Sequence, residues 1–300
     1  MRRLLLPTLL LAACSNGSKA PPAAPVTIEP TIALGTDNAI DATRACIRAA
    51  FDLERLMYVG VGLLNFPRPI EEPQSEPGSA VISREIFGAM GGSVVLTWDD
   101  RDGDDEYTSG DVFTMAFEGY NDQSVVLDGT MQVTGLVIAG RLPSDGVWIM
   151  DGTLELLNLT LTIGSQQWPI TTKIPFHFEN RLIVELLEVE LPEEVTLGPY
   201  TLQPGSWFQR YAGSESVSHA YGGAVYAADL DGVLTYSTKG FMGGFPFFAD
   251  PTTGLFHIEG AEKSLIELEP GFFTLNVRID ADGDGVFEEE QVSSFFALAP

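Results

Sequence analysis

Apolar and polar residues alternate along most of the chain from Ser79 to Pro300. Runs rich in valine, leucine, threonine and aromatic residues are separated by glycine, asparagine or aspartate, and they fall at 93–98, 112–120, 124–138, 147–163, 168–179, 183–191, 224–238, 255–260, 263–269 and 272–279. A period of two residues is typical of strands that bury one face. Long alternating strands joined by short turns favour a large antiparallel meander. We therefore predict a mainly β domain over 79–300, closed like a barrel or folded as a sandwich.

One stretch near the start follows a helical period instead. Between Asp37 and Tyr58, charged residues recur at spacings of three and four, and Cys46 and Met57 belong to an apolar stripe on the opposite side. This pattern predicts one N-terminal amphipathic helix within 37–66 that packs on the β domain. A proline-rich stretch follows and separates the helix from the strands.

The first residues resemble the export signal of bacterial lipoproteins. A basic start and a leucine-rich run lead to the sequence Leu-Ala-Ala-Cys, which ends at Cys14 and is similar to the lipobox. The resemblance implies that 1–13 is removed as a signal peptide, that Cys14 is lipidated, and that Ser15 favours the outer membrane. The segment 14–36 is rich in proline, alanine and serine, so we expect a lipidated flexible tether there.

Composition narrows the range of partners. The formal net charge of −26 opposes binding to nucleic acid or to anionic lipid headgroups. The apolar content of 45% is enough for a full core in a chain of 300 residues. Because Cys14 is the expected lipidation site, Cys46 has no partner for an internal disulfide and is predicted to be a buried core residue.

The last predicted strand runs into a loop with carboxylates at alternate positions. Oxygen ligands at every second residue, with a glycine at the sixth position, are typical of a calcium loop. The predicted ligands are Asp280, Asp282, Asp284, the backbone carbonyl of Val286, and Glu288. Position twelve is a glutamine, so either Glu288 or Glu290 would close the ligand shell.

A second acidic loop lies between the runs 93–98 and 112–120. It resembles the loop of a dockerin or an EF-hand, with aspartate as the last ligand. Asp105 stands where a glycine is expected, and neither acidic loop is flanked by two helices, so no EF-hand domain is implied. The predicted ligands are Asp100, Asp102, Asp104, Glu106 through its carbonyl, Thr108 and Asp111.

Repulsion supplies the physical argument for an ion at these loops. Two carboxylates about 4 Å apart repel by about 1 kcal/mol in water, and by several times more when partly desolvated. A divalent cation removes that repulsion, so we expect calcium in a structural role, with the weak affinity of extracellular modules, about 10⁻⁴ to 10⁻³ M. The alternative is that both loops are solvated acidic turns without an ion.

Two longer blocks carry a family resemblance. The block TWDDRDGDDEYTSGD at 97–111 and a second block within 254–288, which ends in DADGDGVFE, are similar to recurring blocks of uncharacterised proteobacterial secreted proteins and lipoproteins. The resemblance implies an envelope location and a β fold, and it implies no reaction.

The histidines and nucleophiles follow no catalytic spacing. His177, His219 and His257 are far apart and form no zinc-binding motif, and the chain contains no G-x-S-x-G. A glycosidase needs only two carboxylates, and with 42 acidic residues that chemistry stays open. The sequence therefore favours a protein without enzymatic activity.

Aromatic residues clustered near glycines are candidates for ligand binding: Trp207, Tyr211, Phe241, Phe245 and Phe247. Such residues can form a platform for sugars or a lip for acyl chains, or they can close one end of the sheet. The sequence thus predicts an outer-membrane lipoprotein with a calcium-stabilised β domain and a binding or structural role in the cell envelope. Its partner would be an envelope protein, a glycan or a lipid. The alternatives are a periplasmic carrier of lipids or other hydrophobic ligands and a carboxylate-pair glycosidase.

Overall fold

The computed structural model describes residues 28–64, 81–102, 107–122, 125–140, 147–163, 165–181, 184–214, 216–244, 251–272 and 274–294. Cys14, the predicted signal peptide and most of the predicted tether lie outside these residues. The same holds for four of the predicted site residues, which are Asp104, Glu106, Phe245 and Phe247.

One helix and a sheet of 17 strands make up the described fold. The helix is α1 (Ala39–Leu64), and two short 3-10 turns are η1 (Ala228–Leu230) and η2 (Ala261–Lys263). The strands are β1 (Val81–Phe87), β2 (Ser93–Asp99), β3 (Val112–Asp122), β4 (Val125–Ala139), β5 (Val147–Ile163), β6 (Gln166–Arg181), β7 (Val184–Glu190), β8 (Val195–Leu197), β9 (Tyr200–Leu202), β10 (Trp207–Gly213), β11 (Val217–Ala227), β12 (Gly232–Thr238), β13 (Met242–Gly244), β14 (Phe256–Glu259), β15 (Leu265–Pro270), β16 (Leu275–Asp280) and β17 (Glu289–Ser293).

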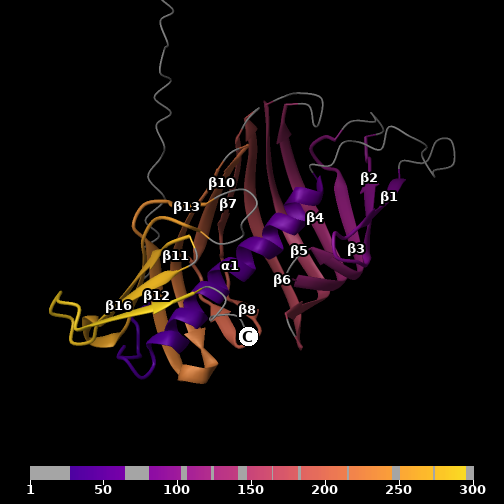
Figure 1. Cartoon of the computed structure of the whole chain (residues 1–300). Coiled ribbons are helices and arrows are strands. Elements are labelled where there is room, and N and C mark those ends of the chain that lie inside the picture. The colour runs from indigo at the N-terminus through magenta and orange to yellow at the C-terminus, as the bar shows by residue number, and fades with distance from the viewer. Residues whose placement is uncertain are drawn as a thin grey trace, which may run out of the picture.

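All the strand pairs are antiparallel, and most join strands that follow each other in the chain. The strands β1 to β7 pair in sequence, β7 pairs with β10, and the order continues through β11, β12, β14, β15 and β16 to β17. Figure 1 shows β1 at one end of the sheet and β16 near the other, with the two ends far apart. The predicted antiparallel β fold with one helix is confirmed, and the sheet stays open rather than closing into a barrel.

The sheet curves around α1, which crosses it diagonally (Figure 1). The helix contacts β5, β8, β9, β11, β12 and β14, so strands from the middle and the end of the chain enclose it. Gly60 lets the helix approach β5 closely, since a Cβ there would come within 2.9 Å of a Leu154 methyl carbon. Asp41, on the predicted polar side of the helix, is exposed, and Arg44 on the same side is half-buried. The buried part of α1 is wider than the predicted apolar stripe and includes the charged residues Asp52 and Glu54.

Large side chains fill the space between the helix and the sheet. We call the face of the sheet toward α1 the inner face and the opposite one the outer face. Trp98, Phe113, Trp148 and Phe178 are each no more than 2% exposed in this core. Burying a side chain of this size contributes about 1.5–3 kcal/mol relative to leaving it in water. No helix in the described part of the chain is long and apolar enough to cross a membrane.

Candidate metal centre

The acidic loop between β16 and β17 is organised by one buried carboxylate. Asp280 ends β16 and is 3% exposed. Its Oδ1 accepts a hydrogen bond from the amide of Gly283 at 2.8 Å, and its Oδ2 accepts one from the amide of Gly285 at 2.9 Å. Both glycines have left-handed backbone, with φ of +73° and +88°, a conformation that glycine adopts without steric cost. The chain therefore turns tightly around the Asp280 side chain.

Four carboxylates of this loop converge. Asp280, Asp282, Asp284 and Glu288 each offer an oxygen, and these oxygens all lie within 4.8 Å of one another. Backbone amides orient the three exposed members of this group. The side chain of Asp282 accepts a hydrogen bond from the amide of Asp284 at 3.2 Å, and that of Asp284 accepts one from the amide of Val286 at 2.7 Å. The side chain of Glu288 accepts one from the amide of Ala281 at 2.9 Å. The predicted convergence of these side chains is therefore present in the structure.

The structure also separates the two glutamates that the sequence left as alternatives. Glu288 belongs to the carboxylate cluster, whereas Glu290 lies in β17 opposite Arg278 of β16. Val286 is 62% exposed, and its amide donates to Asp284 Oδ1. The role of its carbonyl as a ligand stays a prediction.

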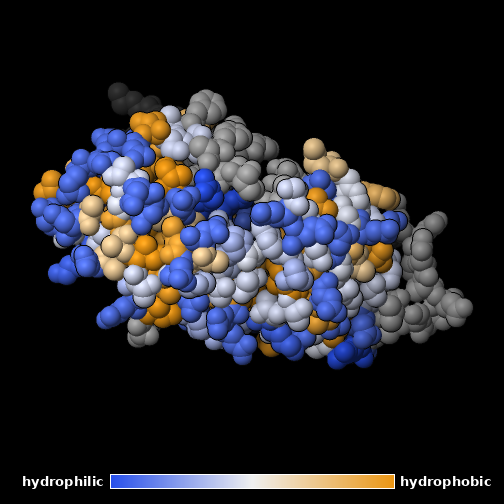
Figure 2. Space-filling view, turned by 90° about the horizontal axis from the view of Figure 1, so that it is seen from below, coloured by the Kyte–Doolittle hydropathy of each residue, from blue (hydrophilic) through white to orange (hydrophobic). Residues whose placement is uncertain are grey.

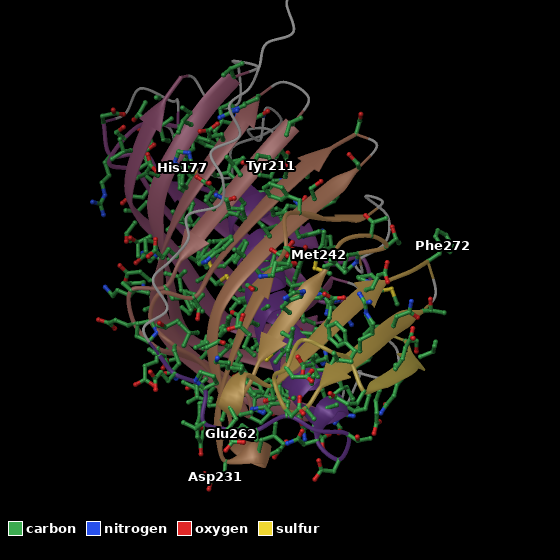
Figure 3. All side chains as sticks on the ribbon, turned by 90° about the vertical axis from the view of Figure 1, so that its left-hand side faces the viewer. His177, Tyr211, Asp231, Met242, Glu262 and Phe272 are labelled. Carbon is green, nitrogen blue, oxygen red and sulfur yellow. The ribbon has the colours of Figure 1, made fainter. Side chains whose placement is uncertain are left out.

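The short turn η2 supports this loop from one side. A Cβ on Gly283 would come within 2.7 Å of the carbonyl oxygen of Glu262, so the two backbones are in close contact. Figure 3 shows Glu262 at the lower end of the molecule. From the segment before α1, the Thr36 hydroxyl donates to Glu289 Oε1 at 2.6 Å. The loop thus contacts η2, and the hairpin that carries it is also bonded to the segment before α1.

The loop between β2 and β3 gathers a second, smaller set of carboxylates. Oxygens of Asp100, Asp102 and Asp111 also lie within 4.8 Å of one another. Asp111 is 1% exposed and accepts hydrogen bonds from Trp98 Nε1 at 2.9 Å, from the Arg101 amide at 3.2 Å and from the Thr108 amide at 3.0 Å. The Thr108 hydroxyl donates to Asp102 Oδ2 at 2.9 Å. The four described members of the predicted six-residue ligand set are therefore brought together.

Both clusters contain only carboxylates among their side-chain ligands. Hard cations such as calcium and magnesium prefer oxygen ligands, and zinc sites usually include histidine or cysteine. The donor set therefore fits calcium or magnesium.

Three of the predicted aromatic ligand residues, Trp207, Tyr211 and Phe241, belong to the described part of the chain. Trp207 is 8% exposed and lies against β11, where a Cβ on Gly222 would come within 2.6 Å of the indole nitrogen. Tyr211 instead packs edge-on against Phe241, with ring centroids 5.3 Å apart.

A buried ionic network links α1 to the sheet, and the sequence reasoning missed it. Glu54 accepts hydrogen bonds from His219 Nδ1 at 2.9 Å and from the Tyr221 hydroxyl, and Arg210 Nε lies 3.2 Å from the same carboxylate. Burial alone would raise the pKa of Glu54, but His219, Arg210 and Tyr221 outweigh it and hold the pKa below its ordinary range. The only sequence signal was an acidic residue on the apolar side of a helix.

The other two histidines each bind different carboxylates. His177 lies between Asp151, at 2.6 Å from Nδ1, and Glu179, at 2.9 Å from Nε2. Burial lowers the pKa of His177, but these two acidic partners outweigh burial and raise it overall. His257 Nε2 lies 2.8 Å from Glu267. Each of the three histidines therefore contacts its own separate acidic group or groups.

Comparisons with protein-family models, with curated proteins and with solved structures found no match to this chain.

Proposed function

We propose that this protein is a non-catalytic β-sheet scaffold of the cell envelope, stiffened by calcium and held at the outer membrane through lipid on Cys14. The observation that carries the proposal is the convergence of Asp280, Asp282, Asp284 and Glu288 within 4.8 Å. Without an ion, each close pair of carboxylates opposes the folded loop by about 1 kcal/mol or more. A bound calcium ion would reverse the sign of that contribution.

The position of the ion would explain what it stabilises. The loop closes the hairpin of β16 and β17 at one edge of the open sheet, and it contacts η2 as well. An edge strand has few neighbours and frays easily. Calcium at this hairpin would hold the last strands of the sheet in place, which is a structural role.

The geometry favours a scaffold over a carrier of hydrophobic ligands. A carrier of that kind would hold its ligand against the inner face, and α1 fills that space with buried side chains such as Phe51, Leu56 and Met57. Figure 2 shows one face of the molecule from below, where hydrophilic residues predominate and hydrophobic ones form small separate groups. Small groups of this kind are usual on soluble proteins.

Thermal unfolding in calcium tests the structural role. With a dissociation constant of about 10⁻⁴ to 10⁻³ M, calcium at about 10 mM stabilises the folded state by about 1.4–2.7 kcal/mol. We therefore expect the midpoint to rise by roughly 3–10 °C relative to excess EGTA at equal ionic strength. In the double variant Asp282→Asn/Asp284→Asn the calcium effect should shrink to the part that the Asp100 cluster contributes, while the exposed control Asp229→Asn should keep the full effect. An equal shift in the double variant, or no shift in the wild-type protein, would contradict the proposal.

The membrane anchor needs a separate test. Labelling cells with an alkyne fatty acid should tag the protein, and the variant Cys14→Ser should lose the tag and leave the membrane fraction. A protein that is tagged equally in this variant would exclude Cys14 as the lipidated residue.

A further inference from the structure

The outer face of the sheet carries a hollow above β6, β7 and β10. It encloses about 260 Å³ and is lined by residues that include Pro175, His177, Glu188, Glu190, Trp207 and Gln209. Figure 3 looks onto this face, with α1 behind the strands and His177 and Tyr211 labelled. The hollow is far from both acidic loops in the order of strands, so it is independent of the calcium proposal.

Strand register explains how these side chains meet. Asp151, His177, Glu188 and Gln209 occupy successive opposed positions on β5, β6, β7 and β10, so they form one row across the outer face. Glu190 and Trp207 are opposed one step further along β7 and β10. Side chains two residues apart on a strand share a face. The hollow therefore lies over two neighbouring rows.

One polar atom in this row has no partner. Gln209 is 3% exposed, and its Nε2 donates to Glu188 Oε1 at 2.5 Å. That bond fixes the orientation of the amide, because the opposite orientation would put two acceptors together. The remaining atom, Gln209 Oε1, is buried and accepts no hydrogen bond. A buried acceptor left without a donor destabilises a fold by about 1–3 kcal/mol.

The charges around the hollow are also unbalanced. Glu188 and Glu190 both line it, and no lysine or arginine of the described residues forms an ion pair with either. The nearby cationic groups have other partners, since His177 binds Asp151 and Glu179, and Arg181 binds Glu179. The hollow thus presents hydrogen-bond acceptors and negative charge, together with the indole of Trp207.

We propose that this hollow binds an organic cation with N–H donors, a primary ammonium or a guanidinium on a short alkyl chain. The N–H groups would donate to Gln209 Oε1 and to the carboxylates of Glu188 and Glu190, and the indole of Trp207 would contact the cation or its alkyl chain. A volume of about 260 Å³ has room for roughly eight water-sized groups. That space suits a small amine or the end of a lysine or arginine side chain from a partner protein.

Indole NMR signals give a direct test, because the chain has four tryptophans and Trp207→Phe identifies the signal of Trp207. The purified protein is titrated with n-butylammonium, with agmatine and with an acetylated, amidated Gly-Lys-Gly peptide, and n-pentanol serves as the uncharged probe. We expect saturable movement of the Trp207 signal with the cations and none with the alcohol. Binding of the free amines alone would identify a small-molecule ligand, and binding of the peptide would identify a partner protein.

Charge-neutral variants separate this idea from simple surface attraction. Glu190→Gln, at an exposed position, and Glu188→Gln should each weaken binding of the cations at least tenfold. Glu118→Gln, which makes the same charge change at an exposed position on β3, should leave binding within twofold. The proposal is overturned if the alcohol binds as well as the cations, if the Glu190 variant binds as tightly as the wild type, or if no cation moves the Trp207 signal.

Discussion

Removing the Glu54 carboxylate should be one of the most destabilising single changes in the described fold. The carboxylate joins α1 to β10 and β11 through Arg210, His219 and Tyr221. In Glu54→Ala the Arg210 guanidinium stays in the interior without its counter-charge, and the His219 imidazole loses its hydrogen-bond acceptor. Breaking a buried ion pair by removing one partner destabilises proteins by about 3–5 kcal/mol, and we expect a loss in that range.

Two further variants separate the effect of an unpaired buried charge from the effect of a lost hydrogen bond. Tyr221→Phe removes only the phenolic hydroxyl and keeps the ring packed 5.1 Å from the ring of Phe51, so it should destabilise by about 1.5–3 kcal/mol, the usual effect of a hydrogen bond to a charged group. The triple variant Glu54→Leu/Arg210→Met/His219→Leu removes the whole ionic set. Apolar replacements of buried ion pairs are often neutral, so this variant should recover most of the stability lost in Glu54→Ala.

Urea unfolding at pH 7 and at pH 3 gives the free energy of unfolding of each variant. The comparison requires that the variants share the same m value, which is the slope of that free energy against urea concentration. The pKa of Glu54 is lowered in the folded state, so its ionised form contributes stability above its ordinary value of 4.5. That contribution is lost as the pH falls through the lowered, folded-state pKa. The reasoning would be refuted if Glu54→Ala lost less stability than Tyr221→Phe, or if its loss were the same at both pH values.

Three other predictions concern the loops and the outer face. Terbium bound at the Asp100 cluster should luminesce when tryptophan is excited, because the indole of Trp98 donates a hydrogen bond to Asp111 and so lies beside the cluster. The variant Trp98→Phe should abolish this luminescence, and added calcium should displace the terbium and reduce it. The pKa of His177 is raised in the folded state, so protonation of this histidine stabilises the protein fully below the unfolded pKa of about 6.5. That stabilisation is lost as the pH rises through the folded-state pKa. In urea unfolding, His177→Gln should therefore lower the free energy of unfolding more at pH 5.5 than at pH 9. Gly283→Ala should lower the free energy of unfolding by about 1–3 kcal/mol, because φ is +73° and a Cβ there would meet the Glu262 carbonyl oxygen. The control Gly62→Ala in α1 has open space around it, so in the same unfolding assay it should be neutral or stabilising by up to about 1 kcal/mol.

Alternation in the sequence located the long central strands well. The run 147–163 coincides with β5, because a long strand with one face in the core repeats the same period many times. Strands at the edges were harder to predict. The run Glu289–Ser293 forms β17, yet none of its residues is buried, so it lacks the apolar alternation of a core strand.

The helix shows how tertiary contacts override local signals. Gly60 and Gly62 have low helix propensity, but α1 continues through them to Leu64 because its last turns are buried against the sheet. The convergence of carboxylates in the acidic loop was predictable because these residues lie close together in the chain. The Glu54 network was not, since His219 follows 165 residues later and only the fold brings the two together.

The enclosure of α1 by late strands has a consequence for how the protein is made. The helix leaves the ribosome before the strands, but part of the surface that buries it belongs to β11, β12 and β14, the last of which ends at Glu259. Contacts of such long sequence separation form slowly, and here they cannot form before most of the polypeptide has been synthesised. A nascent chain of this design cannot complete the packing of its helix until near the end of translation.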